Sequence, residues 1–294
     1  MLPPSLLPLS RVRLEVIIEM KDGILIIDKP QGVTSHDVVA MVRKALHTKK
    51  VGHTGTLDPL ATGVLVVCVE KATKLVKYLE SDRKVYEVEM QFGIQTDTGD
   101  ITGNVIRKEK EVVIDLSKLK CIMNSFIGKQ KQVPPMYSAI KVNGQKLYEL
   151  ARQGITVERE ARDIEIFDIS NISLEGPILK YTVSCSKGTY VRSLCEDIAA
   201  KLGTCGTMTN LRRSKAGHFE IKEAIKVEDI SEEKIISMEK LFDKEVNVKE
   251  YLKRLLNGDK INVQQPDGLY KLYADEFIGI GKIEGNYLKR EIIL

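Results

Sequence analysis

The sequence has no uninterrupted apolar run near the ~18 residues that a membrane-spanning helix needs, so we expect no membrane span. It also lacks a convincing secretory signal. The apolar stretch at its start has no charged region before it and is interrupted by Pro3, Pro4 and Pro8. These absences favour a cytoplasmic protein. We interpret residues 1–19 as an extra segment that is not native and Met20 as the true start.

The cysteines and histidines lack the spacing that metal sites require. The five cysteines are an odd number without a C-x-x-C pair, and several lie inside apolar runs, which is typical of reduced core thiols. None of the four histidines belongs to an H-E-x-x-H motif. No Gly-Lys-Ser/Thr follows the glycine-rich stretch at Gly52, so a phosphate-binding loop is also excluded. We predict no metal and no nucleoside triphosphate.

Length and composition indicate a globular protein. The chain has 294 residues, of which 43% are hydrophobic and 29% charged. Both fractions are close to the averages of globular proteins and exclude a disordered chain. At ~100–200 residues per domain, this length allows one large domain or a large and a small one.

Basic residues are concentrated in two stretches, although the net charge is only +4. Residues 41–57 carry four basic residues and no acid, namely Arg43, Lys44, Lys49 and Lys50. Residues 128–152 carry five against the single acid Glu149, namely Lys129, Lys131, Lys141, Lys146 and Arg152. Residues 219–250 are acidic and would repel phosphate. One basic face on a nearly neutral body is typical of a nucleic-acid-binding protein, while an ordinary solvated surface explains either cluster alone.

The order of predicted elements indicates an α+β fold. Apolar runs and alternating patterns predict strands at 23–28, 64–69, 84–92, 163–174 and 179–186, and 3.6-residue spacing predicts helices at 35–46, 71–80, 116–126 and 189–202. Residues 52–59 are predicted as a loop, 95–103 as a long turn, and 132–139 with Asn143-Gly144 as an extended arm and hairpin. We expect a mixed, largely antiparallel sheet with flanking helices rather than a doubly wound one.

The end of the chain has a different pattern from the rest. Glycines separate short apolar runs there, which is typical of a small β-rich appendage. We therefore predict a main domain over residues 20–242 and a small module over residues 243–294.

Asp58 is the first candidate for chemistry, because a glycine-bounded loop before a buried strand can hold a carboxylate rigidly at a cleft. The alternative is that Asp58-Pro59 only initiates a turn. Arg192 can pair with a buried carboxylate or, more ordinarily, with Glu196 on its own helix. Tyr86 can equally be a cross-strand packing residue. Leu211-Arg212-Arg213 with Lys215 reads as a basic turn.

Taken together, these motifs resemble those of the TruB-type tRNA pseudouridine synthases. The resemblance runs from about residue 23 to residue 213 in the family's order and spacing. It lies in Asp28-Lys29-Pro30 with Gly32 and Ser35, Gly52-His53-Thr54-Gly55-Thr56-Leu57-Asp58-Pro59 and the six residues after it, Lys84-Val85-Tyr86, Thr96-Asp97-Thr98 with Asp100 and Gly103, Gln132-Val133-Pro134-Pro135-Met136-Tyr137-Ser138-Ala139, Ser186-Lys187-Gly188-Thr189-Tyr190-Val191-Arg192, and Leu211-Arg212-Arg213.

The resemblance implies a pseudouridine synthase fold, a PUA-like RNA-binding module at the C-terminal end and the conversion of a uridine at position 55 in the tRNA T-arm. Asp58 would be the essential carboxylate, with Tyr190 and Arg192 completing the catalytic set. The residues implied at the uridine are His53, Tyr86, Leu211 and Lys29. An insertion over about residues 128–155 would grip the RNA, and the contacting residues would be Lys49, Lys50, Lys129, Lys131, Lys141, Lys146, Arg152 and Arg212.

This chemistry breaks the C1′–N1 bond and rejoins the base through C5 without redox change, so no cofactor is expected. The target base must flip out of its stack. We expect a buried Asp58, held ionised by Arg192, and Tyr190 as a general base or a group that positions the sugar. Three alternatives stay open: an RNA chaperone, a guide-RNA-dependent subunit and a nucleoside hydrolase. The arm and the absence of a lysine-rich tail favour an enzyme without guide RNA or obligatory partner. The lack of an evident exposed apolar stripe favours a monomer.

Overall fold

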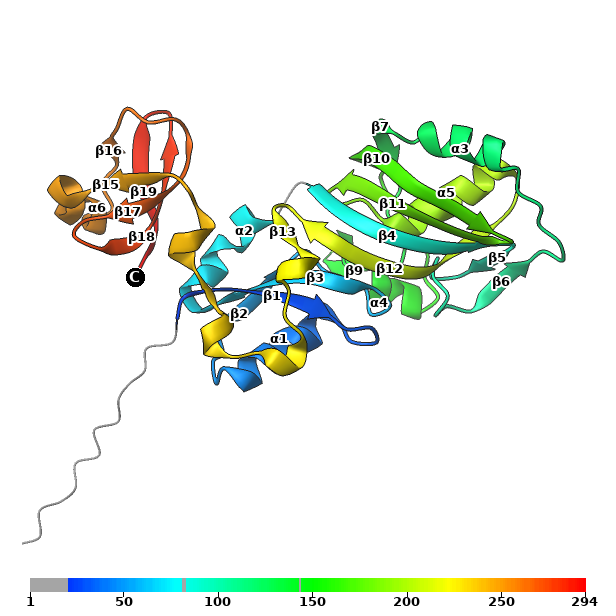
Figure 1. Cartoon of the computed structure of the whole chain (residues 1–294), viewed down its shortest axis with the longest axis horizontal. Coiled ribbons are helices and arrows are strands. Elements are labelled where there is room, and N and C mark those ends of the chain that lie inside the picture. The colour runs from blue at the N-terminus through cyan, green and yellow to red at the C-terminus, as the bar shows by residue number, and fades with distance from the viewer. Residues whose placement is uncertain (1–20, 81–82, 143) are drawn as a thin grey trace, which may run out of the picture.

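The computed structural model describes residues 21–80, 83–142 and 144–294, which form a large body and a smaller C-terminal module (Figure 1). The predicted extra segment 1–19 and the predicted start at Met20 lie outside the described residues. Within the described part of the chain, no helix is long and apolar enough to cross a membrane.

A ten-stranded sheet forms the large body. Its main path runs, in spatial order, through β14 (Ile236–Ser237), β1 (Gly23–Lys29), β3 (Thr62–Val69), β12 (Gly206–Ala216), β4 (Arg83–Phe92), β11 (Ile178–Ser186), β10 (Arg162–Glu175) and β7 (Gly128–Gln132). Two further strands, β2 (Val51–Thr54) and β13 (Phe219–Glu220), pair with β3 and β12. Among the described residues, only β12 and β3 pair in parallel in this sheet. The prediction of a mixed, largely antiparallel sheet is confirmed.

Both faces of β1 and β3 are covered, which explains their nearly continuous apolar sequences. On one face, Val38, Val39 and Val42 of α1 (Ser35–Ala45) pack against Leu25 and Leu65. On the other face lie the 3₁₀ segment η1 (Glu70–Leu75) and α2 (Val76–Leu79). Thr34 caps α1, because its side chain accepts a hydrogen bond from the backbone N–H of Asp37.

The other half of the sheet has one covered face. Alternate residues of β4, including Tyr86, Val88 and Met90, point into a core that α3 (Leu116–Asn124) and α5 (Val191–Leu202) close (Figure 1). Gly203 ends α5 in the left-handed conformation, with φ of 86°, as its position after the apolar pattern predicts. This packing places the first residues of α5 at the middle of the molecule.

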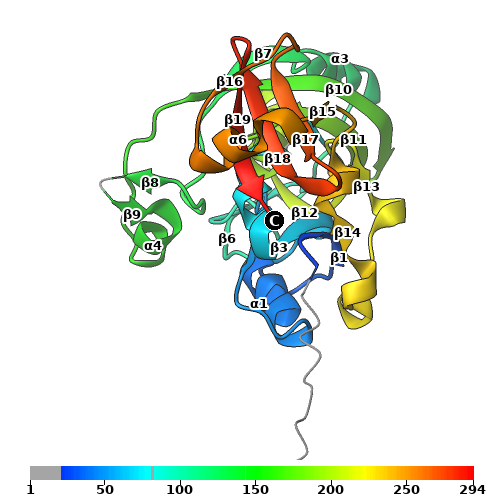
Figure 2. The same ribbon diagram turned by 90° about the vertical axis from the view of Figure 1, so that its left-hand side faces the viewer.

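A projecting arm and a small hairpin complete the body. The hairpin is formed by β5 (Ile94–Thr96) and β6 (Val105–Lys108). The arm contains β8 (Lys141–Val142), β9 (Gln145–Lys146) and α4 (Leu147–Arg152), and it projects from one side of the body (Figure 2). The predicted arm and hairpin are confirmed by this arm and its β8–β9 pair, while Asn143 of the predicted turn lies outside the described residues.

Four local predictions were wrong in part. Residues 52–54 belong to β2 rather than to a loop, because Val51 and Thr54 are buried against β3. The predicted helix 71–80 begins as the 3₁₀ segment η1. The predicted turn 95–103 begins inside β5. The expected basic turn at Leu211 lies within β12, where Leu211 and Arg213 are buried.

The C-terminal module is a five-stranded sheet. Its spatial order is β15 (Glu245–Asn247), β17 (Gly268–Tyr273), β18 (Phe277–Glu284), β19 (Tyr287–Ile293) and β16 (Ile261–Asn262), and α6 (Leu252–Asn257) packs against it. Ile280 and Ile292 extend the core of the body by packing with Leu75 and Leu79. Between the sheets the chain runs through short 3₁₀ segments, η2 (Ile221–Glu223), η3 (Val227–Asp229), η4 (Glu232–Lys234) and η5 (Met238–Leu241), and η6 (Lys249–Tyr251) follows β15.

Gly63 allows β3 and β12 to approach each other beside the Asp58 loop. Its φ is 101°, and a Cβ atom at this position would lie 2.3 Å from the carbonyl oxygen of Arg213. We expect Gly63→Ala to lower the free energy of unfolding by about 2–3 kcal/mol, since backbone must shift and the conformation is strained. Gly52→Ala is the matched control, because its Cβ would make only ordinary contacts with Val76 at 3.7 Å and Thr73 at 3.9 Å. Equal urea midpoints for the two variants would contradict this account.

Candidate active site

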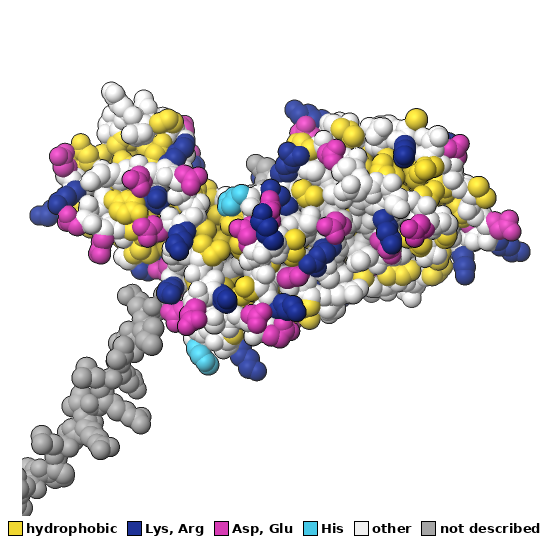
Figure 3. All heavy atoms as spheres, in the orientation of Figure 1, with side chains coloured by type: hydrophobic (Ala, Val, Ile, Leu, Met, Phe, Trp, Pro, Cys, Tyr) yellow, Lys and Arg dark blue, Asp and Glu magenta, His cyan; other side chains and the backbone are white. Residues whose placement is uncertain are grey.

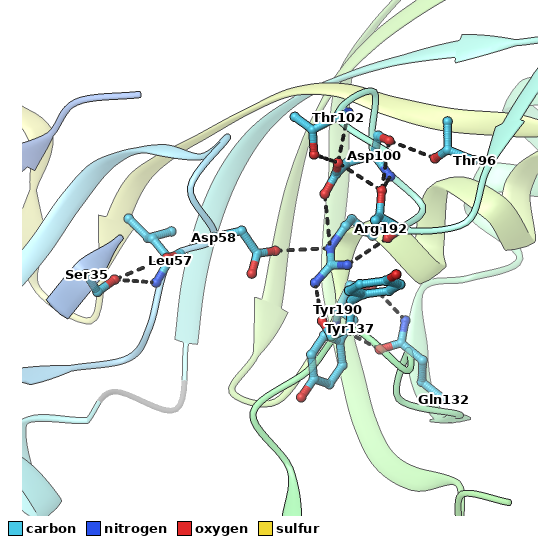
Figure 4. A network of polar contacts seen from close by, with 11 residues as sticks. Ser35, Leu57, Asp58, Thr96, Asp100, Thr102, Gln132, Tyr137, Tyr190 and Arg192 are labelled. Carbon is cyan, nitrogen blue, oxygen red and sulfur yellow. Dashed lines mark hydrogen bonds and ion pairs between the residues drawn. The ribbon is translucent and has the colours of Figure 1, made fainter. Parts of the chain in front are cut away.

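Asp58 lies in the connection between β2 and β3, which α1 holds in place. The Ser35 hydroxyl donates to the Leu57 carbonyl oxygen at 3.1 Å and accepts from the Leu57 N–H at 2.9 Å. The residue next to Asp58 is thereby fixed to the start of α1 (Figure 4). The Asp58 side chain is 39% exposed, so the expectation of a buried carboxylate was wrong for the free protein. Loop 55–61 leaves one side of the carboxylate open.

Arg192 ties Asp58 to two other segments (Figure 4). Its Nε donates to Asp58 Oδ2 at 3.0 Å, one terminal nitrogen donates to the Thr98 carbonyl at 2.7 Å, and the other donates to the Tyr137 carbonyl at 2.8 Å. Its side chain is only 5% exposed. The alternative of an ordinary pair with Glu196 on the same helix is therefore not what the structure shows. Residues 134 positions apart in the sequence form the central ion pair.

Asp100 supports this arrangement from behind. It is buried, and its Oδ2 lies 3.9 Å from Arg192 Nε. Its Oδ1 accepts from the Thr102 N–H at 3.0 Å, from the Thr102 hydroxyl at 2.5 Å and from the Thr98 hydroxyl at 3.1 Å. Arg192 therefore lies between an open carboxylate and a buried one.

Tyr190 directly precedes α5 and lies beside Arg192 in Figure 4. Its backbone is held by Gln132: the Gln132 Nε2 donates to the Tyr190 carbonyl at 3.0 Å, and the Tyr190 N–H donates to Gln132 Oε1 at 2.8 Å. Burial raises the pKa of the Tyr190 hydroxyl above its ordinary value. The phenol is therefore neutral near pH 7, which favours hydrogen bonding to a substrate over service as a general base.

Buried cations surround the other side of the Asp58 loop. Lys29 is fully buried, and its ammonium donates to the carbonyls of Pro30, Val33 and Pro59 at 2.9, 2.7 and 3.4 Å. Burial lowers the Lys29 pKa to about 8, although the nearby Asp58 opposes this shift. Arg213 donates to the carbonyls of Val64 and Gly55 at 2.7 and 2.9 Å.

The remaining predicted uridine residues lie on β2, β4 and β12. Tyr86 and Leu211 are buried, and burial raises the Tyr86 pKa while the Arg213 guanidinium beside it opposes the shift. His53 is half-buried, its Nδ1 has no hydrogen-bond partner within the described structure, and its ring meets that of His36 edge-on at 5.4 Å. Burial and the neighbouring His36 lower the pKa of His53, so the imidazole is neutral at pH 7.

The predicted RNA-contacting residues divide between three places. Lys49 and Lys50 follow α1, Lys129 and Lys131 lie on the exposed side of β7, and Lys141, Lys146 and Arg152 lie on the arm. Arg212 differs from these, because both its terminal nitrogens bond to Asp28, at 3.2 and 2.8 Å. Figure 3 shows basic and acidic side chains interspersed on one face, including that of the C-terminal module.

Sequence reasoning missed several residues that build the site. Ser35, Asp100 and Gln132 lay inside the quoted motifs without an assigned role, and Arg213 was taken for part of a surface turn. The signal for Arg213 was available, since alternation along β12 places Leu211 and Arg213 on one side and Arg212 on the other. Nothing in the spacing indicates that Gln132 bonds to Tyr190. Among the described residues, no group of histidine, cysteine and acidic side chains could hold a metal.

Comparison with known proteins defines first a class and then a family. A chain from the crystal structure of a Cbf5-Nop10-Gar1 complex has 26% sequence identity to this one, a TM-score of 0.69, and coverage of 92% of this chain and 84% of that chain. A chain from the archaeal box H/ACA sRNP Nop10-Cbf5 complex has 22% identity and a TM-score of 0.66, with coverage of 93% and 86%, and shows the same fold. The fold is therefore that of a pseudouridine synthase.

The family model described as TruB family pseudouridylate synthase (N terminal domain) matches residues 43–191, and that of the tRNA pseudouridylate synthase B C-terminal domain matches residues 192–258. The tRNA pseudouridine synthase B of Clostridium perfringens (strain 13 / Type A) is 47% identical over 93% of this chain and 99% of its own length, and that of Clostridium tetani (strain Massachusetts / E88) is 44% identical over 89% and 95%. The chain belongs to the TruB family of tRNA pseudouridine synthases, isomerases that convert uridine to pseudouridine.

Proposed function

We propose that this synthase modifies the uridine at position 55 in the T-arm of tRNA, and that Asp58 is the carboxylate that reacts with it. The observation that carries the proposal is the ion pair between Asp58 and Arg192. It presents a half-exposed carboxylate, fixed by a buried guanidinium, at a surface where four motif segments meet. A rigid carboxylate that a macromolecular substrate can reach suits a reaction on a base flipped out of an RNA loop.

The proposed reaction needs no co-reactant. The C1′–N1 bond breaks, the detached uracil turns within the site, and a C1′–C5 bond forms. The C5 hydrogen is then lost as a proton while N1 gains one, so atoms and electrons balance without a cofactor. Asp58 either attacks the sugar or removes its C2′ proton. Arg192 holds Asp58 ionised and oriented for either step.

Other residues of the site would hold the flipped nucleotide. Tyr86 offers a face for base stacking, worth ~1–3 kcal/mol, which offsets part of the cost of unstacking. Leu211 supplies an apolar wall, and the neutral His53 ring takes the space that the base leaves. Tyr190 positions the sugar as a hydrogen-bond donor. Lys29 holds the Asp58 loop through its bond to the Pro59 carbonyl and adds positive charge for RNA.

The insertion at about residues 128–155, which contains one of the two basic stretches, would grip the RNA together with the other basic stretch at residues 41–57. Their side chains contact phosphates and so set the position of the T-arm without reading its sequence. The arm carries its own cations at Lys141, Lys146 and Arg152, which supports an enzyme that works as a monomer without guide RNA or obligatory protein partner. We place it in the cytoplasm, where such RNA is modified.

The same proposal divides the chain into a catalytic domain over residues 20–242 and a PUA-like RNA-binding module over residues 243–294. The last strand of the large sheet, β14, ends at Ser237, and the first strand of the second sheet, β15, begins at Glu245. A division between these two strands fits both sheets.

The test is tritium release from a tRNA transcript labelled at uridine C5, with the purified protein alone. We expect one equivalent of tritium per transcript, and none when the uridine at position 55 is replaced by cytidine. The two transcripts should bind with similar affinity, because phosphate contacts dominate binding. Tritium release from both transcripts would show that the modified uridine lies at another position in tRNA. Binding without any release would favour an RNA chaperone or a guide-dependent subunit, and free uracil would indicate a hydrolase.

A further inference from the structure

Gln132 is a buried amide placed between the arm and the catalytic helix. It is the last residue of β7, where the chain leaves the sheet to form the arm, and only 6% of its surface is exposed. Both polar groups of its amide bond to the backbone of one residue: Nε2 donates to the Tyr190 carbonyl, and Oε1 accepts from the Tyr190 N–H. The side chain thus imitates a strand pairing with the backbone that begins α5.

The same short segment is attached a second time, five residues further on. The Tyr137 carbonyl accepts from Arg192, two residues beyond Tyr190, at 2.8 Å (Figure 4). Between these two points stand Pro134 and Pro135, which restrict the backbone. Arg159 also donates to the Pro134 carbonyl at 3.2 Å from the returning side of the arm. The base of the arm is therefore fixed to the first residues of α5.

Tyr190 has no side-chain cap of its own at the start of α5, so the Gln132 amide is the side chain that fixes its backbone on both sides. Arg192 begins the same turn, and its guanidinium must reach Asp58, Thr98 and Tyr137 together. A change in the position of Tyr190 would therefore change the geometry of the Arg192–Asp58 pair, although Gln132 touches neither side chain in that pair.

We propose that Gln132 is a positioning residue for the isomerisation: its amide sets the start of α5, and with it Tyr190 and Arg192, against the base of the RNA-gripping arm. This inference rests on the proposed function, in which Asp58 reacts and Arg192 orients it. Loss of the amide bonds slows the chemical step and leaves RNA affinity unchanged, because the nearest cations that would hold phosphate, Lys129 and Lys131, lie on the opposite, exposed side of β7. A misplacement of reacting groups by ~1 Å can cost ~10²-fold in rate.

The test compares Gln132→Met with Gln130→Met. Gln130 lies two residues earlier on the same side of β7, and its amide makes a local bond to the Phe126 carbonyl at 2.6 Å. We expect Gln132→Met to lower the single-turnover rate of tritium release by about 10- to 100-fold and to change the tRNA Kd by less than about twofold. Gln130→Met should leave both quantities at the parent values.

Gln132→Glu adds a second measurement at the same position. The glutamate keeps an oxygen for the Tyr190 N–H, but it places a carboxylate oxygen against the Tyr190 carbonyl in place of a donor. We expect its rate to fall at least as far as that of the methionine variant. Rates are normalised to the protein that binds tRNA, so molecules that fail to fold do not enter the comparison.

The inference is overturned by a Gln132→Met rate within twofold of the parent, by equal losses in rate and affinity, or by an equal loss in Gln130→Met. These outcomes are separate from failure of the proposed function, which would appear as no tritium release by the parent. They are also separate from a parent whose Asp58→Asn variant remains active.

Discussion

Asp58→Asn is expected to reduce the single-turnover rate of tritium release by about 10³-fold or more. Asparagine has the shape of aspartate, so the loop that Ser35 and Leu57 hold should keep its conformation. Its amide is neither a nucleophile toward C1′ nor a base toward the C2′ proton, and both routes through this residue are lost. The same variant therefore tests the role of the carboxylate without choosing between the two mechanisms.

Binding of tRNA by Asp58→Asn should be retained or tightened. Removal of the carboxylate leaves the positive charge of Arg192 without its nearest anion, which favours a polyanionic ligand. Asp168→Asn is the matched control, since Asp168 is exposed on β10 and its carboxylate accepts a hydrogen bond from the neighbouring Ser170 hydroxyl. Filter binding and tritium release measured on the same preparations give both quantities. A rate within tenfold of the parent would show that another group carries the reaction.

Patterns over short distances predicted most of the elements correctly. The apolar run of β3, the alternation along β4 and the cap at Thr34 are decided by neighbours within a few residues, and each element formed where expected. Two of the failures have one physical cause. A neighbouring strand supplies backbone hydrogen-bond partners in each case. Strand β3 pairs with residues 51–54, and strand β4 pairs with residues 211–213. The glycine and charge content of a short segment does not indicate whether such a partner strand is present.

The candidate site was predicted as a set of residues, and the family resemblance rather than the spacing supplied the set. Physical reasoning alone left Asp58 as a turn residue or a catalyst, and Arg192 as the partner of Glu196 or of a distant carboxylate. Only the folded chain brings Arg192 to Asp58. The roles of Tyr86, His53, Leu211 and Lys29, and of the basic residues toward RNA, stay predictions until substrate is bound.

Electrostatics could not be predicted in the same way. A lysine beside a proline, as in Lys29-Pro30, reads as an exposed turn, yet Lys29 is fully buried with three carbonyl acceptors and a pKa of about 8. Arg212 and Arg213 are adjacent in sequence, and one pairs with Asp28 while the other is almost fully buried. Both guanidinium groups are positive, and their environments depend on which face of β12 each one occupies.

Arg192→Lys is expected to lower the rate of tritium release by about 10²-fold while tRNA binding stays within about threefold. The lysine keeps the positive charge, but its single ammonium cannot bond at once to Asp58, the Thr98 carbonyl and the Tyr137 carbonyl, which three separate guanidinium nitrogens now reach. Asp58 would lose its fixed orientation, and the buried carbonyls would lose a donor. A loss of orientation acts on the chemical step rather than on phosphate contacts.

Arg107→Lys provides the comparison for this substitution. Arg107 pairs with Glu109 at 2.6 Å on β6 and is 55% exposed, so the same exchange there should alter neither rate nor affinity. The effect at Arg192 should be larger than that of removing the Gln132 amide and smaller than that of Asp58→Asn, because the reacting carboxylate is still present. If Arg192→Lys reacted at the parent rate, charge alone would be sufficient. The three hydrogen bonds of the guanidinium would then contribute to the stability of the fold and not to the reaction rate.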